Sequence, residues 1–424
     1  MNLLVVGGGG REHAIIQSLK KNPSVTKIYA LPGNGGIAAD AECAGIAATD
    51  IGGIVNFAKN HDIGFAVVAP DDPLVLGCAD ELEKLGIPVF GPRKNAAIIE
   101  GSKVFSKRLM QKYNIPTAAY AVFTDLKEAL SYIEDAPIPT VIKADGLALG
   151  KGVIIAQTRQ EAKKALRSML EDKIFGESGS RVIIEEFLTG PEVSVLSFTD
   201  GETVVPMISS MDHKRAKDGD QGLNTGGMGT IAPNPYYTAE VARECMETIF
   251  LPTIRAMKAE GRPFRGCLYF GLMLTPDGPK VIEYNCRFGD PETQVVLPLL
   301  ETDLLTIMQA VAAGKLSQVE VKWKDASAAC VVMASDGYPT HYEKGFPITL
   351  PELGADEHIF IAGAKLQEGT LVTSGGRVLG AVSVKSTLKE AVDGAYALAE
   401  RIRFGNAYYH RDIGQRALAA KEEQ

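Results

Sequence analysis

Residues 143–152 read KADGLALGKG, a glycine-rich run between two segments of β-branched residues. The pattern predicts a strand over 140–143, a turn, and a second strand over 152–156. The run is not a P-loop of the G-x-x-x-x-G-K-[ST] type, because Gly152 stands where the hydroxyl residue is needed and a strand, not a helix, follows. We expect a hairpin flap whose amides close over ATP phosphates, with Lys143 as a fixed positive charge. The alternative, an exposed flexible hairpin, leaves Lys143 unexplained.

A second run, EYNCRFGDPE over 283–292, has the alternation of a strand. Odd positions of a strand share one face, so Glu283, Asn285 and Arg287 should point the same way. Carboxylate and amide oxygens suit Mg²⁺, and a neighbouring arginine suits a transferring phosphoryl group or a carboxylate. A solvated polar strand face is the alternative. The two acids of the following turn, Asp290 and Glu292, favour the metal site.

Composition narrows the class of protein. The chain has 424 residues, which is too many for one core, so two to four domains are expected. The net charge of -8 and a pI of about 5.5 argue against a nucleic-acid binder. Six cysteines without C-x-x-C spacing predict free thiols in a reducing, cytoplasmic compartment. No apolar run reaches the length of a membrane span, no signal peptide is evident, and zinc is not expected.

The N-terminal segment alternates strand and helix patterns, which predicts a small doubly wound parallel sheet. Strands are expected at 3–6, 28–31, 65–69 and 87–90, with a helix at 12–20. The run GGGGREH at 7–13 is tempting as a dinucleotide fingerprint. It fails because Glu12 or His13 stands where the third glycine is required, so a sugar phosphate or a tight structural turn is favoured over NAD.

Beyond residue 102 the pattern becomes α+β. Expected helices are 103–112, capped by Ser102, then 161–171 and 239–258; expected strands are 120–123, 140–143, 152–156, 181–185, 193–198, 268–274 and 280–285. The tail from about 327 should be a unit of its own, with strands at 328–333 and 377–384. Thr387 with Glu390 predicts a capping box for a helix running to residue 403.

Two further segments are candidates for binding. Residues 212–229 are polar and glycine-rich without apolar periodicity, so we expect a mobile cover over a phosphorylated intermediate, the alternative being a solvated loop. The strand end at Glu185, Glu186, Phe187 and Leu188, followed by Glu192, offers backbone groups to an adenine edge and a carboxylate to ribose hydroxyls. Alone, that signal is weak.

The order of these residues resembles the ATP-grasp enzymes. Within that superfamily the chain is similar to the phosphoribosylamine–glycine ligases, also called glycinamide ribonucleotide synthetases, over essentially its whole length. The motifs that carry the resemblance are GGREHA at 9–14, DHKR at 212–215, NTGGMG at 224–229 and RFGDPE at 287–292. Two departures are visible: Asp71 replaces the family's usual glutamate, and the strand at 269–273 lacks the metal carboxylate of many ATP-grasp relatives.

The resemblance implies a multidomain α/β and α+β fold. An N-terminal doubly wound, Rossmann-like substrate domain is expected at 1–101. A two-lobed ATP-grasp region should follow at 102–326, with the smaller, nucleotide-covering lobe at about 120–190. A small C-terminal α+β domain is expected at 327–424.

The implied reaction joins glycine to 5-phosphoribosylamine at the expense of ATP, by way of a glycyl phosphate, in purine biosynthesis. Arg287 is implied to hold the glycine carboxylate or acyl phosphate, Asp212 the ammonium group, and Lys143 the phosphates. The ATP contacts implied are Lys103, Lys143, Gly146, Gly150, Lys151, Gly152, Glu185, Glu186, Phe187, Leu188 and Glu192. The substrate contacts implied are Gly9, Gly10, Arg11, Gly33, Asn34, Gly35, Asp71, Pro73, Asp212, Lys214, Asn224, Gly226, Gly227, Arg287 and Asp290. Mg²⁺ or Mn²⁺ is expected on Glu283 and Asn285.

The expected partners are small molecules, with neither nucleic acid nor membrane, and a monomer is expected, with a dimer as the alternative. Other functions remain open from the residues alone. They are an NAD-dependent oxidoreductase, another ATP-grasp carboxylate–amine ligase or carboxylase, and a nucleotide-binding regulatory protein without turnover.

Overall fold

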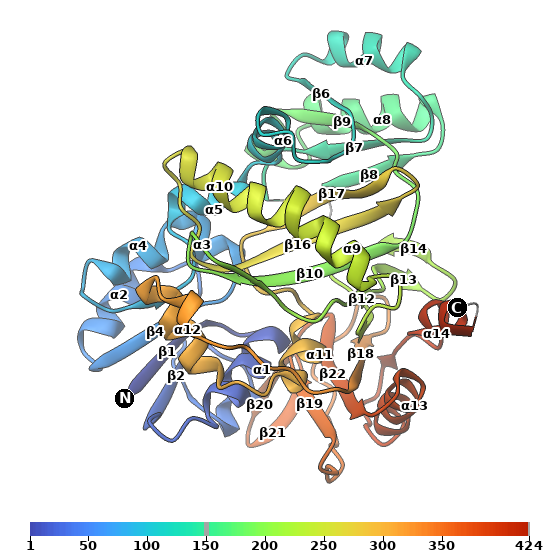
Figure 1. The fold of residues 1–424 in the computed structure, drawn as a ribbon. Helices are drawn as coiled ribbons and strands as arrows, with labels where there is room; N and C mark the ends of the chain where they lie inside the picture. Colours follow the sequence, from blue (N-terminus) through green and yellow to red (C-terminus); the bar gives the residue numbers. More distant parts are fainter. Residues whose placement is uncertain (148–151, 423–424) are drawn as a thin grey trace.

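The computed structural model of the protein describes residues 1–147 and 152–422. Its N-terminal part is a parallel sheet with strand order β3-β2-β1-β4-β5, which confirms the predicted doubly wound arrangement (Figure 1). The strands are β1 (Asn2–Gly7), β2 (Lys27–Pro32), β3 (Glu42–Cys43), β4 (Ile63–Val68) and β5 (Val89–Phe90). The helices are α1 (Gly10–Leu19), α2 (Ile51–Lys59), α3 (Asp71–Leu76) and α4 (Cys78–Glu83).

Strand β1 is apolar on both faces because both faces are covered. Leu3 and Val5 belong to one core cluster and Leu4 and Val6 to another, and all four are buried. A near-continuous apolar run of this kind is typical of a strand at the centre of a parallel sheet.

The smaller lobe of the ATP-binding region is a four-stranded antiparallel sheet of order β6-β9-β7-β8. Its elements are β6 (Tyr120–Phe123), α7 (Leu126–Asp135), β7 (Thr140–Ala144), β8 (Val153–Ala156), α8 (Arg159–Leu170) and β9 (Val182–Glu186). The two helices pack together and share a separate small core with the sheet, including Ile133, Ile142 and Leu166. The strands predicted here, and the helix predicted at 161–171, are confirmed within two residues.

The larger lobe is an antiparallel sheet of order β11-β10-β16-β17. Its strands are β10 (Glu192–Thr199), β11 (Val204–Pro206), β16 (Gly266–Thr275) and β17 (Gly278–Asn285). The helix predicted at 239–258 forms, but a π-helical stretch at Met246–Phe250 divides it into α9 (Ala239–Cys245) and α10 (Leu251–Ala259). It runs across the sheet in Figure 1.

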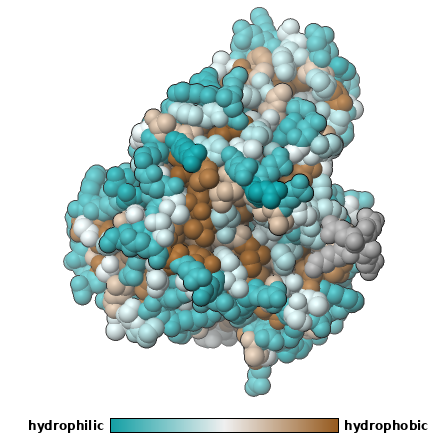
Figure 2. All heavy atoms as spheres, in the orientation of Figure 1, coloured by the Kyte–Doolittle hydropathy of each residue, from teal (hydrophilic) through white to brown (hydrophobic). Residues whose placement is uncertain are grey.

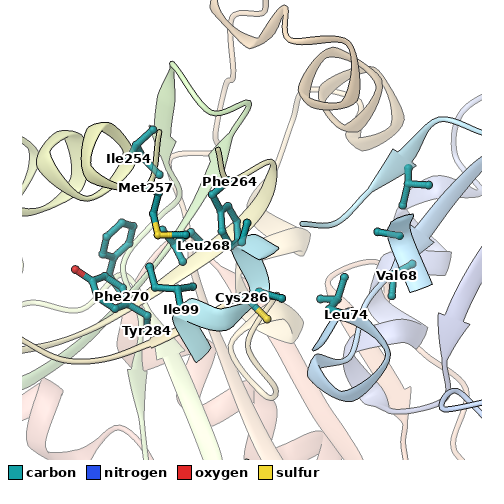
Figure 3. Packing of buried hydrophobic residues seen from close by; sticks show 14 of the residues in the cluster. Val68, Leu74, Ile99, Ile254, Met257, Phe264, Leu268, Phe270, Tyr284 and Cys286 are labelled. Carbon is teal, nitrogen blue, oxygen red and sulfur yellow. The ribbon is translucent and has the colours of Figure 1, made fainter. Parts of the chain in front are cut away.

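One core cluster joins this lobe to the N-terminal part. Figure 3 shows Phe270, Tyr284 and Phe264 of the larger lobe in the same cluster as Leu74 and Val68. Helices α5 (Lys94–Gly101) and α6 (Lys103–Lys112) lie where the two parts meet. Ser102 caps α6 as predicted, its hydroxyl accepting from the Phe105 amide at 3.1 Å.

The C-terminal sheet has the order β12-β15-β18-β22-β19, with β23 (Ala407–Tyr408) paired to β18. Its own strands are β18 (Ser327–Ser335), β19 (Glu357–Ile361) and β22 (Arg377–Lys385), whereas β12 (Met211–Asp212) and β15 (Gly229–Ala232) come from the middle of the chain. The tail is therefore not a sheet of its own, because β15 pairs with β18 in register Ile231 to Ala329. The capping box of Thr387 and Glu390 at α13 (Leu388–Ala399) is confirmed.

The segment at 212–229, predicted as a mobile cover with a solvated loop as the alternative, contains strands. Its two ends are β12 and β15, and a hairpin of β13 (Arg215–Lys217) and β14 (Gln221–Asn224) lies between them. The hairpin tip is docked on the C-terminal part, where the Gly219 amide donates to Asp412 at 2.7 Å. Short polar strands of this kind carry no apolar alternation, which is why periodicity missed them.

Three further helices and one hairpin complete the named elements of the described residues. They are α11 (Thr293–Val296), α12 (Leu304–Ala313), the hairpin β20 (Ala364–Gln367) and β21 (Thr370–Thr373), and α14 (Gln415–Glu422).

Within the described ranges, no helix has the length and apolar character that crossing a bilayer requires. Figure 2 shows hydrophilic residues over most of one face, with apolar residues gathered near its centre.

Phe270→Ala should lower the free energy of unfolding by about 3–5 kcal/mol, because it removes a fully buried ring from the core cluster that the larger lobe shares with the N-terminal part. The ring lies 4.3 Å from that of Phe250 and 5.6 Å from that of Tyr284, centroid to centroid. Urea unfolding followed by circular dichroism measures the loss. Leu353→Ala, at a side chain that is 47% exposed, is the control and should change stability by about 0.5 kcal/mol or less. A loss at Phe270 as small as the control's would contradict tight packing.

Candidate active site

Lys143 lies at the seam between the two lobes. It extends from β7 of the smaller lobe, and its Nζ is 3.0 Å from Glu185 Oε2. The same Nζ donates to the backbone carbonyl of Ile282 on β17 of the larger lobe at 3.1 Å. Lys143 is buried, as its place beside the glycine run suggested. One ammonium group thus contacts both lobes.

Lys107 is a second buried cation that the sequence analysis overlooked. Its Nζ is 3.2 Å from Glu185 Oε2 and donates to Thr117 Oγ1 at 2.7 Å. Burial lowers the pKa of Lys107 to about 8, against the opposing effect of Glu185. Lys107 lies four residues after Lys103 on the same helix, and residues i and i+4 share a helix face. This spacing could have identified Lys107 as a site residue.

Glu185 forms ion pairs with both lysines, but one of its two carboxylate oxygens has no hydrogen bond to them. Its Oε2 is shared by Lys107 and Lys143, while its buried Oε1 has no hydrogen-bond partner within 1–147 and 152–422. A buried acceptor of this kind is expected to be satisfied by some donor.

Lys103 holds the base of the predicted flap. Its Nζ donates to the Gly146 carbonyl at 2.9 Å, and burial lowers its pKa. Asp145, one residue earlier, accepts from the Val104 amide at 2.8 Å and from Ser102 Oγ at 2.9 Å. The flap is thereby tied to the start of α6. Of the remaining flap residues, Gly152 accepts from the Ala144 amide at 2.8 Å, and Gly150 and Lys151 lie outside the described residues.

The predicted adenine-side residues follow β9 and lead to β10. Glu186 is exposed and accepts from the Ala119 amide at 3.3 Å. Phe187 and Leu188 are half-buried in the connection between the two strands. Glu192 begins β10, and its carboxylate lies 3.5 Å from Lys214 Nζ.

The predicted metal strand has the alternation expected of it. Glu283, Asn285 and Arg287 are half-buried, whereas the residues between them, Tyr284 and Cys286, are buried. The separation of polar and apolar faces is thus confirmed.

Cations surround the carboxylate of Glu283. Lys214 Nζ is 3.7 Å away, and it also faces Glu192. Burial alone would raise the pKa of Glu283, but Lys214, Lys143 and Lys103 outweigh it and the pKa is lowered. The carboxylate is therefore ionised at neutral pH and offers hard oxygens. With the Asn285 amide oxygen beside it, this donor set fits a divalent cation such as Mg²⁺.

Glu100, at the end of α5, contacts the same strand and was not predicted as a site residue. Its carboxylate accepts from the Cys286 amide at 2.7 Å and from Asn285 Nδ2 at 3.1 Å, and it lies 3.3 Å from Arg287 Nη2. No motif pointed to it, because the contact joins residues 186 positions apart.

Asp212 and Glu292 form an acidic pair within the site. Burial raises the pKa of Asp212 well above its usual value, and repulsion from Glu292 adds to the shift, while Lys214 opposes it. The pKa of Glu292 is also raised, mainly by burial. Glu292 was noted in the sequence only as an acid of the turn. The pair is suited to an ammonium group, which would relieve the repulsion.

Arg377, from the start of β22, is a further residue that sequence reasoning missed. Its Nη1 donates to the carbonyls of Gly226 at 2.7 Å and Asp290 at 2.8 Å, and its Nη2 lies 3.4 Å from the Asp290 carboxylate. Burial would raise the pKa of Asp290, but Arg377 and Arg11 lower it. The predicted substrate residues Gly226 and Asp290 are thus brought together by the C-terminal part. Asn224 and Gly227 flank Gly226, at the end of β14 and before β15.

The residues predicted for the sugar phosphate lie after strands β1, β2 and β4 at one edge of the sheet. They are Gly9, Gly10 and Arg11, then Gly33, Asn34 and Gly35, then Asp71 and Pro73. At the first of these turns Glu12 already uses the Gly9 amide, at 2.6 Å, and the Arg11 Nε, at 2.6 Å. Arg11 also donates to the Phe288 carbonyl at 3.2 Å. Glu12 therefore satisfies the Gly9 amide and the Arg11 Nε at this turn.

Asn34 is engaged by the protein itself. Its amide nitrogen donates to the carbonyls of Gly8 at 2.9 Å and Ile361 at 2.8 Å, and its oxygen accepts from the amides of Gly36 and Ile37. All the ordinary hydrogen bonds of this side chain are made. Asn34 holds its loop against the C-terminal part. Because its side chain is fully used, a substrate contact at this loop would have to come from the backbone groups.

Comparison with known proteins gives a consistent result along the chain. Three models of phosphoribosylglycinamide synthetase domains match: the N domain at residues 1–100, the ATP-grasp (A) domain at 101–293 and the C domain at 328–416. The phosphoribosylamine–glycine ligase of Vibrio vulnificus (strain CMCP6) is 48% identical over 429 residues, covering 100% of both chains. That of Caldanaerobacter subterraneus subsp. tengcongensis is 48% identical over 413 residues, covering 97% of this chain and 99% of the relative.

Solved structures agree. The phosphoribosylamine–glycine ligase of Thermotoga maritima superposes with a TM-score of 0.87 at 35% identity, covering 97% of this chain and 100% of that one. The biotin carboxylase domain of Hydrogenobacter thermophilus 2-oxoglutarate carboxylase gives a TM-score of 0.75 at 17% identity, covering 99% of this chain and 93% of that one. The second likeness concerns the fold alone.

Affinity for ATP should fall as the pH rises above about 8, because Lys107 then loses its proton and the seam loses positive charge. The direction of the change follows from proton linkage. Below about pH 8, Lys107 of the free protein is already protonated and attracts the phosphates. Above about pH 8, Lys107 must take up a proton when ATP binds, and this weakens binding. The decline should approach tenfold per pH unit. Lys107→Arg keeps its charge and should bind ATP equally well at pH 7 and 9.5, as measured by calorimetry. Parallel profiles for the two proteins would contradict the assignment.

Proposed function

The chain belongs to the phosphoribosylglycinamide synthetase family, and from that premise we propose how its residues carry out the reaction. It is an ATP-dependent ligase of purine biosynthesis that joins glycine to 5-phosphoribosylamine, giving glycinamide ribonucleotide, ADP and phosphate. The observation that carries the site assignment is the cationic surrounding of the Glu283 carboxylate: Lys214 Nζ lies 3.7 Å away, and Lys143 and Lys103 also act to lower its pKa.

The chemistry explains why the site needs a triphosphate. A carboxylate does not acylate an amine, because an oxide is a poor leaving group. We propose that a glycine carboxylate oxygen attacks the γ-phosphorus of ATP, which releases ADP and forms glycyl phosphate. The amine of 5-phosphoribosylamine then attacks the acyl carbon, phosphate leaves with the bonding electrons, and the amine loses a proton. The site must align these groups, stabilise phosphate charge and exclude water.

The nucleotide side of the site is assigned to the seam between the lobes. Lys103 and Lys143 are proposed to bind the phosphates together with the flap residues Gly146, Gly150, Lys151 and Gly152. The adenosine end is proposed to contact Glu185, Glu186, Phe187, Leu188 and Glu192. The orphaned Glu185 Oε1 supports this placement, because the edge of a base carries the donor that it lacks.

Mg²⁺ or Mn²⁺ is assigned to Glu283 and Asn285. When bound there, the cation would neutralise phosphate charge. The residues fit the ion because Glu283 is held ionised by its neighbouring cations and the Asn285 amide nitrogen is already engaged by Glu100. Lys214 bridges from Glu192 to Glu283 and so keeps the nucleotide and metal residues at a fixed separation.

We assign the substrate side of the site to the residues that follow β17, the strand of Glu283 and Asn285, and to the loops named below. Arg287 is proposed to hold the glycine carboxylate and then the acyl phosphate, and Asp212, with Glu292, the glycine ammonium group. The other substrate contacts proposed are Gly9, Gly10, Arg11, the backbone of Gly33, Asn34 and Gly35, Asp71, Pro73, Lys214, Asn224, Gly226, Gly227 and Asp290. The acids favour the ammonium group and the arginines the anionic ones.

Several broader assignments accompany these roles. We propose domains at 1–101, 102–326 and 327–424, a monomer in solution, and a cytoplasmic location. All six cysteines are free thiols, which supports a reducing compartment. The likeness to biotin carboxylase at 17% identity concerns the fold and gives no support to a carboxylase reaction.

ADP release measured with each substrate omitted in turn tests the reaction. With ATP, glycine and freshly made 5-phosphoribosylamine together, ADP and glycinamide ribonucleotide should appear in equal amounts. Omission of either glycine or the amine should abolish product. Bicarbonate-dependent ADP release in their absence would instead indicate a carboxylase.

Glu283→Gln should reduce kcat by about 100-fold or more at saturating ATP, because it removes a charged metal ligand. Raising the Mg²⁺ concentration should recover part of the activity. Glu301→Gln, at an exposed position away from the site, is the matched control and should keep wild-type kcat. Equal activity of the two variants, measured by coupled ADP release, would remove Glu283 from the metal site.

A further inference from the structure

Glu100 is a single buried carboxylate that binds three consecutive residues of another domain. It lies at the end of α5 and is 8% exposed. One oxygen, Oε2, accepts from the Cys286 amide at 2.7 Å. The other, Oε1, accepts from Asn285 Nδ2 at 3.1 Å and lies 3.3 Å from Arg287 Nη2. Its neighbour Ile99 and Cys286 belong to the same core cluster, so the contact has a rigid base (Figure 3).

The contact decides which way the Asn285 amide faces. The Asn285 nitrogen donates to Glu100 and to the Tyr284 carbonyl at 2.9 Å, so both of its N–H groups are used. Were the amide turned over, its oxygen would face a carboxylate and a carbonyl, which are both acceptors. Glu100 therefore keeps the oxygen of Asn285 on the other side, where the proposed cation site lies.

The same carboxylate holds Arg287. This guanidinium is mostly buried, and its Nε has no hydrogen-bond partner in the described part of the chain. Its Nη1 donates to the Phe288 carbonyl at 3.2 Å, and Glu100 is the ion-pair partner of Nη2. Asp71, in the first turn of α3, also acts electrostatically on both Glu100 and Arg287. Glu100 thus holds Arg287 directly, and the charge of Asp71 acts on both groups.

We propose that Glu100 is a positioning residue of the ligase. Its carboxylate aims the Asn285 oxygen at the divalent cation and fixes the Arg287 guanidinium for the substrate carboxylate. The inference rests on the proposed function, because it presumes that Glu283 and Asn285 bind the cation. It adds that the orientation of this ligand is set from the N-terminal side of the site.

The test is Glu100→Gln, which keeps the shape of the side chain. If the new amide oxygen accepts from Cys286, its NH₂ group must face the NH₂ of Asn285 and the Arg287 guanidinium, which are both donors. The Mg²⁺ concentration for half-maximal activity should rise about 10- to 100-fold. The affinity for Mn²⁺ in the presence of a non-hydrolysable ATP analogue, measured by electron paramagnetic resonance, should fall by a similar factor without turnover.

A compensating substitution separates positioning from mere stability. In Glu100→Gln/Asn285→Asp, one oxygen of the introduced carboxylate can accept from the new amide and the other can face the cation. Mn²⁺ affinity should return to within about threefold of wild type. Asp80→Asn is the matched control, since Asp80 accepts from the Lys94 amide at the opposite end of α5 at 2.8 Å. It should leave both metal measurements unchanged, whatever its effect on Tm.

Three outcomes would overturn the proposal. They are unchanged metal measurements in folded Glu100→Gln, an equal loss in Asp80→Asn, and no recovery in the double variant. If Glu100→Gln does not fold, Glu100→Asp replaces it, because the carboxylate is then withdrawn by one methylene and the same rise in Mg²⁺ requirement is expected. Wild-type protein that makes no glycinamide ribonucleotide would refute the proposed function instead, and the Mn²⁺ measurement separates the two failures.

Discussion

Burial of charge at the seam between the lobes is the constraint on which the site depends. Lys107, Lys143 and Glu185 are all buried, and an isolated buried charge is costly unless it is paired. The smaller lobe provides Lys143 and Glu185, α6 provides Lys107, and the larger lobe provides a backbone carbonyl for Lys143. Neither lobe alone satisfies these groups. The hydrogen bond from Lys143 to Ile282 therefore ties this charged cluster to the larger lobe, and within the described residues one carboxylate oxygen at the seam is left without a partner.

The C-terminal part belongs to the site as much as the two lobes do. Its sheet takes in β12 and β15, so the ends of the segment that carries Lys214 are strands of that sheet. Arg377 then joins Gly226 to Asp290, and Asn34 joins the N-terminal loop to Ile361. Truncation near residue 327 would thus leave unpaired strand edges and free the loops that the proposed substrate contacts occupy.

Local patterns predicted the elements well, because strand alternation and helix caps depend on neighbours in sequence. The strands around the glycine run, the Ser102 cap and the polar face of Glu283 and Asn285 were all found in this way. Glu100 and Arg377 were missed because each acts on residues far away in sequence, and neither lies in a motif. The hairpin at 215–224 was missed because short polar strands have no apolar face to reveal them. The family resemblance supplied the roles, which periodicity alone cannot give.

Acids and cations interleave in the site, and their local arrangement gives the substrates a direction. On the nucleotide side, Lys103, Lys107 and Lys143 outnumber Glu185, so the seam favours a polyanion. Around Glu283, Asp212 and Glu292, acids and cations alternate, because Lys214 acts on all three carboxylates and Arg287 acts on Glu283 and Glu292. A zwitterion such as glycine matches this alternation, with Arg287 for its carboxylate and Asp212 and Glu292 for its ammonium group in the proposed assignment. The net charge of -8 for the whole chain hides this arrangement, because a bound substrate responds to the local charges and not to their sum.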